Sequence, residues 1–445
     1  MLEERQIRSI LEAALAYSKA EQTEVSLHAG DSALTRFANN YIHQNVAEST
    51  ASIIVRAVLG KRVGVATVSS VEESAIRSAM DRALEMARHQ HEDPDFRSLP
   101  APAPTKKAAA YVQRTADFGP EERAAAVAVV CRRAQEGGLV ASGAFSNGVG
   151  QVAIANSLGL FAYHLETEAN YNTVVMSDTG SGYGERWAAD INDIDPGALA
   201  AEAIGKAQRS RNPASLEAGE YTVVLEEYAV SDILDFLAYL GFSAKAVQEG
   251  HSFMAGRFGA PVVGENISIW DDALGPGTAS MPFDFEGVPK QRVDLIVDGV
   301  ANAVCHDSYT AWKENVESTG HALPGGHGFG PVPRNLYLQT GDATLEDMIA
   351  STRRGILVTR FHYTRVVHPL TVTITGMTRD GTFLIEDGRI VGPVKNFRFT
   401  QSYLDALSHV EMIGRDSRLM QTMFSYNRVP ALKIEGWNFT GVTEY

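Results

Sequence analysis

Apolar residues along residues 1–92 recur at two spacings, one typical of helices and one typical of strands. Apolar positions at helical spacing predict an amphipathic helix over residues 3–19 and a second helix over residues 71–88, capped by Ser69 or Ser70. Between the two helices, alternating apolar and polar residues predict β-strands. The alternating runs cover residues 24–28, 34–45 and 52–59. The first unit therefore has the order helix, strands, helix.

The same order returns between residues 111 and 211. A helix is predicted over residues 119–136, where a proline near the first turn loses no hydrogen bond, and a closing helix is predicted over residues 196–208. The strand-like runs between them are residues 140–146, 151–155, 160–166 and 172–176. We interpret the two α/β units as products of a duplication. Residues 93–110 are rich in proline and are expected to be a linker, because such a stretch cannot hold a helix.

Residues 219–445 are rich in strand patterns and glycine, which predicts a β-rich C-terminal domain. Helices predicted over residues 229–247 and 344–354 interrupt the strands. The candidate strands are residues 222–225, 262–269, 292–297, 370–375, 383–386 and 432–435. Hairpin turns are predicted at the Asp-Gly pairs 298–299, 380–381 and 387–388. Because parallel βαβ alternation is missing, the predicted class is α+β: duplicated helix–sheet–helix units followed by a β-rich domain with a central helix.

Composition and charge argue against two classes of function, nucleic-acid binding and membrane insertion. The chain has 445 residues, of which 44% are hydrophobic, and its formal net charge of −15 argues against a nucleic-acid partner. No apolar run approaches the roughly 18 residues that a membrane span needs. The N-terminal helix has no apolar signal core, and two cysteines suit a reducing compartment, so a cytoplasmic location is expected. Cys131 fits a buried helical position, whereas Cys305 stands beside His306 and is an alternative nucleophile.

The segment from Glu220 to Gly264 resembles, without a gap, the zinc segment of the TldD/TldE (PmbA) family. TldD-type members carry a His-Glu-x-x-x-His motif there. In this chain the two ligand histidines fall on Asp235 and Leu240, and the catalytic glutamate falls on Phe236. Leucine and phenylalanine cannot bind a metal or move a proton, and one aspartate is a poor zinc site. The resemblance therefore implies a TldE-type member without catalytic or metal-binding residues of its own.

Later motifs extend the resemblance over about 220 residues. They occur in family order at residues 284–289, 318–321, 333–335, 340–342 and 385–394. TldD-type members also carry a cysteine ligand near the C-terminus, and the corresponding run, residues 419–430, contains no cysteine. Both parts of the expected zinc site are therefore lost. The glycine-rich run 325–330, which contains His327, lacks the ending of a phosphate-binding loop and is expected to form a flap beside a cleft.

The resemblance implies a subunit of a heteromeric zinc peptidase that acts on extended peptides. A TldD-like partner would supply the zinc, and this chain would need no cofactor. Residues that match family motifs form the candidate peptide cleft: Asp284, Glu286, Gly287, Thr319, Gly320 and His321. We also expect dimerisation, largely through residues 219–445, with Trp270, Trp312 and Trp437 as possible anchors. Two alternatives remain open: a stand-alone homodimeric peptide-binding protein, or a peptidase that uses another set, such as Cys305 with His306 or His321.

Overall fold

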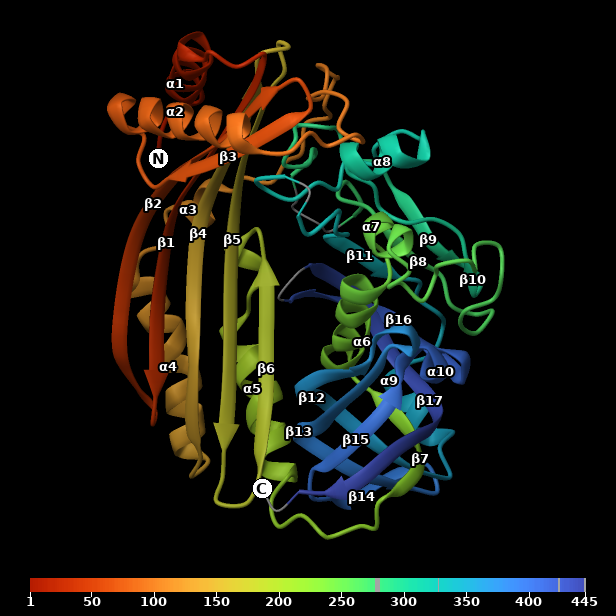
Figure 1. The fold of residues 1–445 in the computed structure, drawn as a ribbon. Coiled ribbons are helices and arrows are strands. Elements are labelled where there is room, and N and C mark those ends of the chain that lie inside the picture. Colours follow the sequence, from red (N-terminus) through yellow and green to blue (C-terminus); the bar gives the residue numbers. More distant parts are fainter. Residues whose placement is uncertain (277–280, 327, 423–424, 444–445) are drawn as a thin grey trace.

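The computed structural model describes residues 1–276, 281–326, 328–422 and 425–443. Residues up to 211 form one six-stranded antiparallel sheet in the order β3-β2-β1-β4-β5-β6 (Figure 1). Its strands are β1 (Gln22–Ala38), β2 (Tyr41–Leu59), β3 (Arg62–Val68), β4 (Val140–Asn156), β5 (Phe161–Met176) and β6 (Ser181–Ala188). Each half contributes three consecutive strands, and β1 pairs with β4 at the centre.

Several strands are longer than the sequence pattern predicts. The predicted run 34–45 is not one strand, because Asn39 and Asn40 adopt positive φ angles of 53° and 64° and turn the chain from β1 into β2. The runs 140–146 and 151–155 are parts of the single strand β4. Gly148 interrupts the alternation in sequence, yet it continues the strand, and a Cβ there would lie 3.0 Å from the Asp31 carbonyl oxygen.

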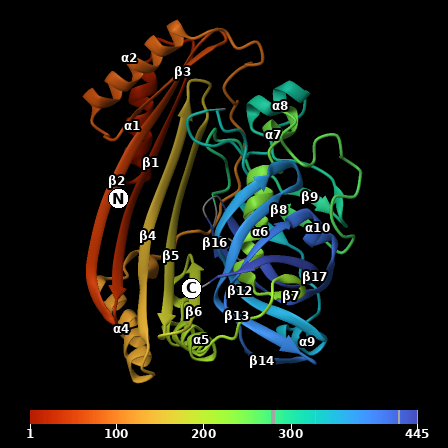
Figure 2. The same ribbon diagram turned by 60° about the horizontal axis from the view of Figure 1, so that its bottom comes forward.

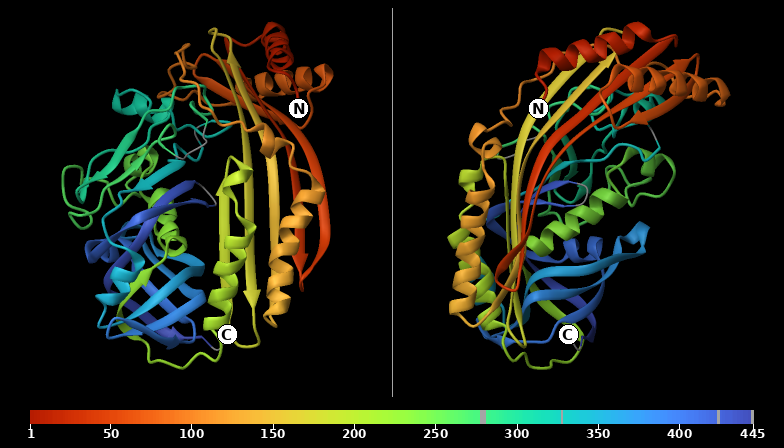
Figure 3. Two further views of the ribbon diagram at one scale, coloured as in Figure 1. Left: turned by 180° about the vertical axis from the view of Figure 1, so that it is seen from behind. Right: turned by 90° about the vertical axis from the view of Figure 1, so that its left-hand side faces the viewer.

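Four helices cover one face of this sheet (Figure 3). They are α1 (Glu4–Tyr17), α2 (Glu73–His89), α4 (Pro120–Glu136) and α5 (Pro196–Arg209). All four were predicted, but the expected N-cap of α2 was wrong. Glu72 holds that position, and the Ser70 hydroxyl accepts a hydrogen bond from the Glu72 N–H instead. Residues 91–112, which include the whole predicted linker (93–110), carry no helix or strand.

The apolar residues that face these helices form two clusters on the same side of the sheet. Val25 and Leu27 pack under α1 and α2, whereas Phe145 and Tyr171 pack under α4 and α5. On the opposite face, Ile154 belongs to a cluster with residues 281 and 283 of the C-terminal domain. The alternation of the strands therefore directs one face to the helices and the other to the C-terminal domain.

Five strands of the C-terminal domain close into a ring, β17-β15-β13-β12-β7, because β7 pairs with both β12 and β17. Figure 2 shows these strands beside the central helix α6. The ring is formed by β7 (Gly219–Leu225), β12 (Arg354–His368), β13 (Thr373–Glu386), β15 (Phe397–Ser402) and β17 (Tyr426–Val442). Strands β14 (Arg389–Pro393) and β16 (Val410–Gln421) flank the ring, and β11 (Asn335–Leu338), β8 (Ile269–Asp271), β9 (Val293–Val297) and β10 (Val300–Ala301) extend it.

The predicted helix over 229–247 is two helices, α6 (Glu227–Leu240) and α7 (Ala244–Gln248). The break falls at Gly241, where a Cβ would lie 1.9 Å from the Phe253 ring. Shorter helices are α8 (Ser308–Glu314), α9 (Leu345–Ala350) and α10 (Tyr403–Ser408). The apolar face of α6 packs into the core as predicted, since Ile233, Leu234 and Leu237 are fully buried.

Some strand and turn predictions in this domain were wrong. Residues 262–268 form a loop and not the predicted strand. Their apolar side chains are buried, but the Val262 N–H donates a hydrogen bond to the Gly299 carbonyl outside any strand ladder. The Asp380–Gly381 pair is not a hairpin turn but an irregularity inside β13, where the register with β12 shifts. The pairs at 298–299 and 387–388 do connect neighbouring antiparallel strands. The α+β class is confirmed.

Candidate functional site

Helix α6 carries the three positions at which the family resemblance places zinc chemistry. The carboxylate of Asp235 accepts hydrogen bonds from Thr422 Oγ1 at 2.5 Å and Ser425 Oγ at 3.2 Å. Phe236 is half-buried, and its ring lies 6.1 Å from the ring of Tyr403. Leu240 is half-buried against the main core. The helix and the cysteine-free C-terminal run are thus neighbours in space, although 187 residues separate Asp235 from Thr422.

The donor set at this place does not fit zinc. Among the described residues, the groups that bond to the Asp235 carboxylate here are two hydroxyls, whereas zinc sites in proteins use about three or four Cys, His or carboxylate ligands. Across the described ranges, no group of three or more His, Cys, Asp or Glu side chains is arranged to hold a metal ion. Met423 and Phe424 of the C-terminal run, and His327 of the predicted flap, lie outside the described residues.

A second carboxylate lies one turn earlier on α6. Burial raises the pKa of Asp232 to about 7, the hydroxyls of Thr364 and Tyr403 oppose this shift, and the charge of Asp235 adds to it. Asn427 on β17 donates from Nδ2 to the Ser231 carbonyl at 3.1 Å. This side of α6 is therefore held to the C-terminal strands by hydroxyl, amide and carboxyl groups.

Acidic and aromatic residues face this region from the long sheet, and the sequence reasoning missed them. Gln421 Nε2 lies 3.5 Å from the Glu168 carboxylate on β5, and the rings of Trp187 and Tyr426 are 4.6 Å apart. Desolvation raises the pKa of Glu168, and the charge of Glu166 adds to the rise. The signal was present in the sequence, because residues 164, 166 and 168 alternate along one strand and so share a face.

The structure brings the six predicted cleft residues into one region, but mostly as buried groups. The carboxylate of Asp284 accepts hydrogen bonds from the backbone N–H groups of residues 286, 288 and 322, each at 2.9 Å. Burial raises the pKa of Asp284 to about 8, and the charge of Glu286 adds to the shift. Gly287 and Gly320 have φ angles of 77° and 74°, and a Cβ at either would lie 2.5 Å from a neighbouring atom.

Glu286 joins the two parts of the protein. Its carboxylate accepts a hydrogen bond from Arg56 Nη1 on β2 at 3.0 Å and another from the Ser308 N–H at 3.1 Å. Arg56 Nη1 also lies 3.6 Å from Glu24 on β1. All three charged side chains are at most 7% exposed. This buried cluster connects the sheet with the loop that carries Glu286.

His321 and Thr319 belong to a second polar network. His321 Nε2 lies 2.9 Å from Asp271 Oδ1, and its Nδ1 lies 2.9 Å from Thr319 Oγ1. The Thr319 hydroxyl also accepts a hydrogen bond from the His306 N–H at 2.7 Å. The alternative nucleophile Cys305 is fully buried, and burial raises its thiol pKa well above the usual range. This environment opposes formation of the thiolate.

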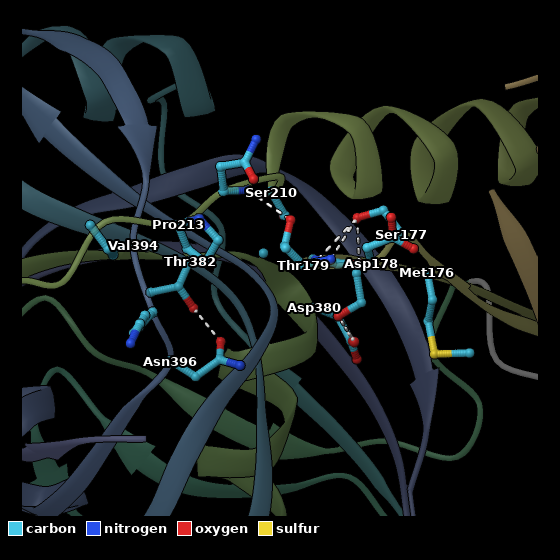
Figure 4. A pocket seen from close by; sticks show the side chains of 15 residues that line it. Met176, Ser177, Asp178, Thr179, Ser210, Pro213, Asp380, Thr382, Val394 and Asn396 are labelled. Carbon is cyan, nitrogen blue, oxygen red and sulfur yellow. Dashed lines mark hydrogen bonds between the residues drawn. The ribbon is translucent and has the colours of Figure 1, made fainter. Parts of the chain in front are cut away.

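A cavity of about 560 Å³ lies elsewhere, between the β5–β6 turn and the C-terminal domain (Figure 4). Its polar groups bond largely to one another. Ser181 Oγ donates to Asp380 at 2.6 Å, and Thr382 Oγ1 donates to Asn396 Oδ1 at 3.0 Å. No residue of α6 lines this cavity. It is therefore part of the contact between the two parts of the chain, separate from the positions around Asp235.

Family profiles relate this chain to metallopeptidases. Sequence profiles of the PmbA/TldA metallopeptidase C-terminal domain, domain 1 and central domain match residues 218–441, 23–87 and 100–211. The chain belongs to the PmbA/TldD family. Its structure is similar to the crystal structure of TldE from Thermococcus kodakarensis, with a TM-score of 0.90 and 21% identity, covering 98% of this chain and 100% of that one.

Named relatives agree with this membership. Metalloprotease PmbA of Escherichia coli O157:H7 is 24% identical over 431 residues, which cover 93% of this chain and 91% of that protein. A metalloprotease TldD homolog of Haemophilus influenzae is 27% identical over 246 residues, 54% of this chain and 51% of the relative. A metalloprotease of Methanothermobacter thermautotrophicus is 30% identical over 184 residues, 40% of each chain. The chain thus spans about half the length, or less, of these last two relatives.

Proposed function

We propose that the chain is a non-catalytic, TldE/PmbA-like subunit of a TldD/TldE-type zinc metallopeptidase that processes extended peptides. The observation that carries the proposal is the side-chain chemistry around Asp235, where two hydroxyls, a phenylalanine and a leucine occupy the expected metal region. Such groups neither hold zinc nor activate water. A TldD-type partner would supply the zinc and the catalytic glutamate, and this chain would carry no cofactor.

The partner in this proposal is another protein subunit, and the substrate is an extended peptide. Extended peptides bind to β-rich proteins by adding a strand to a sheet edge. The net charge of −15 gives no support to a nucleic-acid partner. No helix among the described residues is long and apolar enough to cross a membrane. We place the assembly in the cytoplasm.

We propose that the six predicted cleft residues support the cleft from beneath. Asp284, Glu286 and His321 are each about 1% exposed, and their polar atoms are engaged by backbone N–H groups, Arg56 or Asp271. A peptide that contacted these three side chains would have to break those bonds. Their role is therefore to hold the C-terminal loops against the sheet.

Co-expression with a TldD-type subunit tests the proposal. We expect the tagged chain to co-purify with that subunit, with about one zinc per pair, and to show cleavage of an unstructured peptide that neither chain shows alone. Substituting a motif histidine in the TldD-type subunit should abolish cleavage, whereas Asp235→Ala in this chain should leave the zinc content unchanged. Cleavage by this chain alone would contradict the proposal. A self-associated chain that binds peptide but never engages a TldD-type subunit would instead support the stand-alone alternative.

A further inference from the structure

Four lysine and arginine residues are buried in the part of the chain that the structure describes: Arg56, Arg123, Lys206 and Lys433. Three of them contact a carboxylate, Arg56 at 3.0 Å, Lys206 at 2.5 Å and Lys433 at 2.8 Å. Arg123 on α4 is 3% exposed, and no carboxylate among the described residues contacts its guanidinium. Taking a charge out of water without a counter-charge is costly, and burial lowers the pKa of Arg123. Arg123 is therefore the exception, a buried cation without an anion.

Uncharged acceptors hold the guanidinium of Arg123 in place. Nε donates to Thr35 Oγ1 at 3.1 Å, and Nη1 donates to Asn147 Oδ1 at 2.6 Å and to the Phe118 carbonyl at 3.0 Å. Nη2 makes one long hydrogen bond of 3.4 Å, to Asn45 Oδ1, so the described residues leave one of its two hydrogens without an acceptor. The amide nitrogen of Asn45, on the same group, donates to no described residue. Two neighbouring donors are thus available to a ligand.

These donors line a cavity of about 470 Å³ on the helix-covered face of the long sheet. Strands β1, β2 and β4 form its floor, between the helices α1 and α2 and the helices α4 and α5 (Figure 3). The floor residues include the small Ala33, Ala47 and Gly148, and one wall is formed by α3 (Gln113–Ala116) and the start of α4. The volume lies within the range of about 300–1,000 Å³ that is usual for small-ligand sites. Because the C-terminal domain packs on the opposite face of the sheet, this cavity is separate from Asp235.

The charges around the cavity select the kind of ligand. Three acidic residues line it, Asp31, Glu48 and Asp117, against the single guanidinium of Arg123 and the amino group of Met1, which lies 3.1 Å from Asp31. A plain anion would therefore enter a region with more negative than positive charge. A zwitterion adds no net charge, and it offers a carboxylate to the arginine and an ammonium group to the acidic residues.

We propose that this cavity binds a zwitterion of the size of an amino acid or dipeptide, with its carboxylate on Arg123 and Asn45 and its ammonium group among the acidic residues. A carboxylate has two oxygens and can accept a hydrogen bond from each of the two neighbouring donors. It also supplies the counter-charge that Arg123 lacks within the chain. Binding at this face of the sheet uses neither the metal region around α6 nor a second subunit, so it does not depend on the proposed function.

Isothermal titration calorimetry of the full-length chain with alanine and with alanyl-alanine tests the site. We expect saturable binding of at least one of them, one molecule per chain, with a dissociation constant of about 1 mM or lower. The tighter of the two probes identifies the size of the ligand. Amidation of the probe's carboxylate and acetylation of its amino group should each weaken binding at least about tenfold. Absence of binding up to about 20 mM of either probe, or equal affinity for a blocked form, overturns the proposal.

Two variants of α4 assign the binding to this cavity. Arg123→Gln should weaken binding of the tighter probe at least about tenfold, because it removes the charge that meets the carboxylate. The control Arg132→Gln, at an exposed position of the same helix, should leave the affinity unchanged. A merely structural Arg123 would not make the affinity depend on the free carboxylate of the probe.

Asn45→Ala keeps the test decisive if Arg123→Gln does not fold. Asn45 is exposed on β2, and its replacement removes one of the two donors, so binding should weaken about three- to tenfold. Unchanged affinity in Asn45→Ala, or in a folded Arg123→Gln, overturns the assignment to this cavity. Failure of the titrations, with peptide cleavage by the co-expressed TldD-type pair intact, would overturn this site alone and leave the proposed function standing.

Discussion

Arg56→Met removes the cation from the buried cluster that joins the long sheet to the C-terminal domain. Arg56 is 2% exposed and neutralises Glu286 at 3.0 Å and Glu24 at 3.6 Å. Burial alone would lower the pKa of Arg56, but the charges of these two carboxylates raise it. Breaking a buried ion pair from one side costs about 3–5 kcal/mol, because the remaining charges stay desolvated. Such a loss is a large part of the roughly 5–15 kcal/mol that stabilises a typical protein.

The assay is urea denaturation followed by tryptophan fluorescence at pH 8 and pH 5. Without Arg56, the two carboxylates stay buried without their cation, which disfavours the folded state most where both are ionised. The deficit of the variant should therefore be largest at pH 8 and shrink toward pH 5. The control Arg88→Met breaks an exposed pair with Glu85 and should change stability by less than about 1 kcal/mol. An Arg56→Met loss no larger than the control's, or a deficit that grows toward pH 5, would refute the reasoning.

Three further predictions concern α6. The purified chain should hold no stoichiometric zinc after chelator-free purification, and about one tightly bound zinc per chain in elemental analysis would contradict this. Asp235→His or Phe236→Glu alone should create no zinc-dependent peptide cleavage, and Phe236→Glu should lower the free energy of unfolding by about 1–3 kcal/mol, measured by urea denaturation. The raised pKa of Asp232, about 7, means that ionisation opposes folding, so its contribution to stability falls as pH rises from about 4 to 7. Asp232→Asn should thus be more stable than the parent chain at pH 8, with the difference shrinking toward pH 4 in the same assay; equal stability at both pH values would count against the shift.

The sequence was sufficient for features that depend on local pattern. The helices α1, α2, α4 and α5 were predicted because their apolar faces repeat at helical spacing. Strand lengths were not predictable in this way, since glycines interrupt the alternation of β4 while β1 and β5 hold it in place from both sides. The loop over 262–268 shows the opposite error, because buried apolar side chains there need no strand.

In the candidate site, too, the sequence predicts residue types but not contacts between distant segments. The prediction that the zinc-ligand positions fall on Asp235 and Leu240 rests on residue types alone, and the neighbouring Thr422 lies in a run that the family resemblance had already singled out. The burial of Glu286 against Arg56 was not predictable, because the two residues are 230 positions apart in the sequence. Side chains at such separations meet only through the tertiary fold.

The closed ring of the C-terminal domain also sets an order of folding. β7 leaves the ribosome early, but its two neighbours are β12 and β17, which begin more than 130 and 200 residues later in the sequence. Contacts between such distant segments form slowly, because a long loop must close before any bond rewards it. β12 can pair with one edge of β7 once it is made, but the other edge stays unpaired, and the ring stays open, until β17 is added. Residues 426–442 therefore close a ring of strands that began at residue 219.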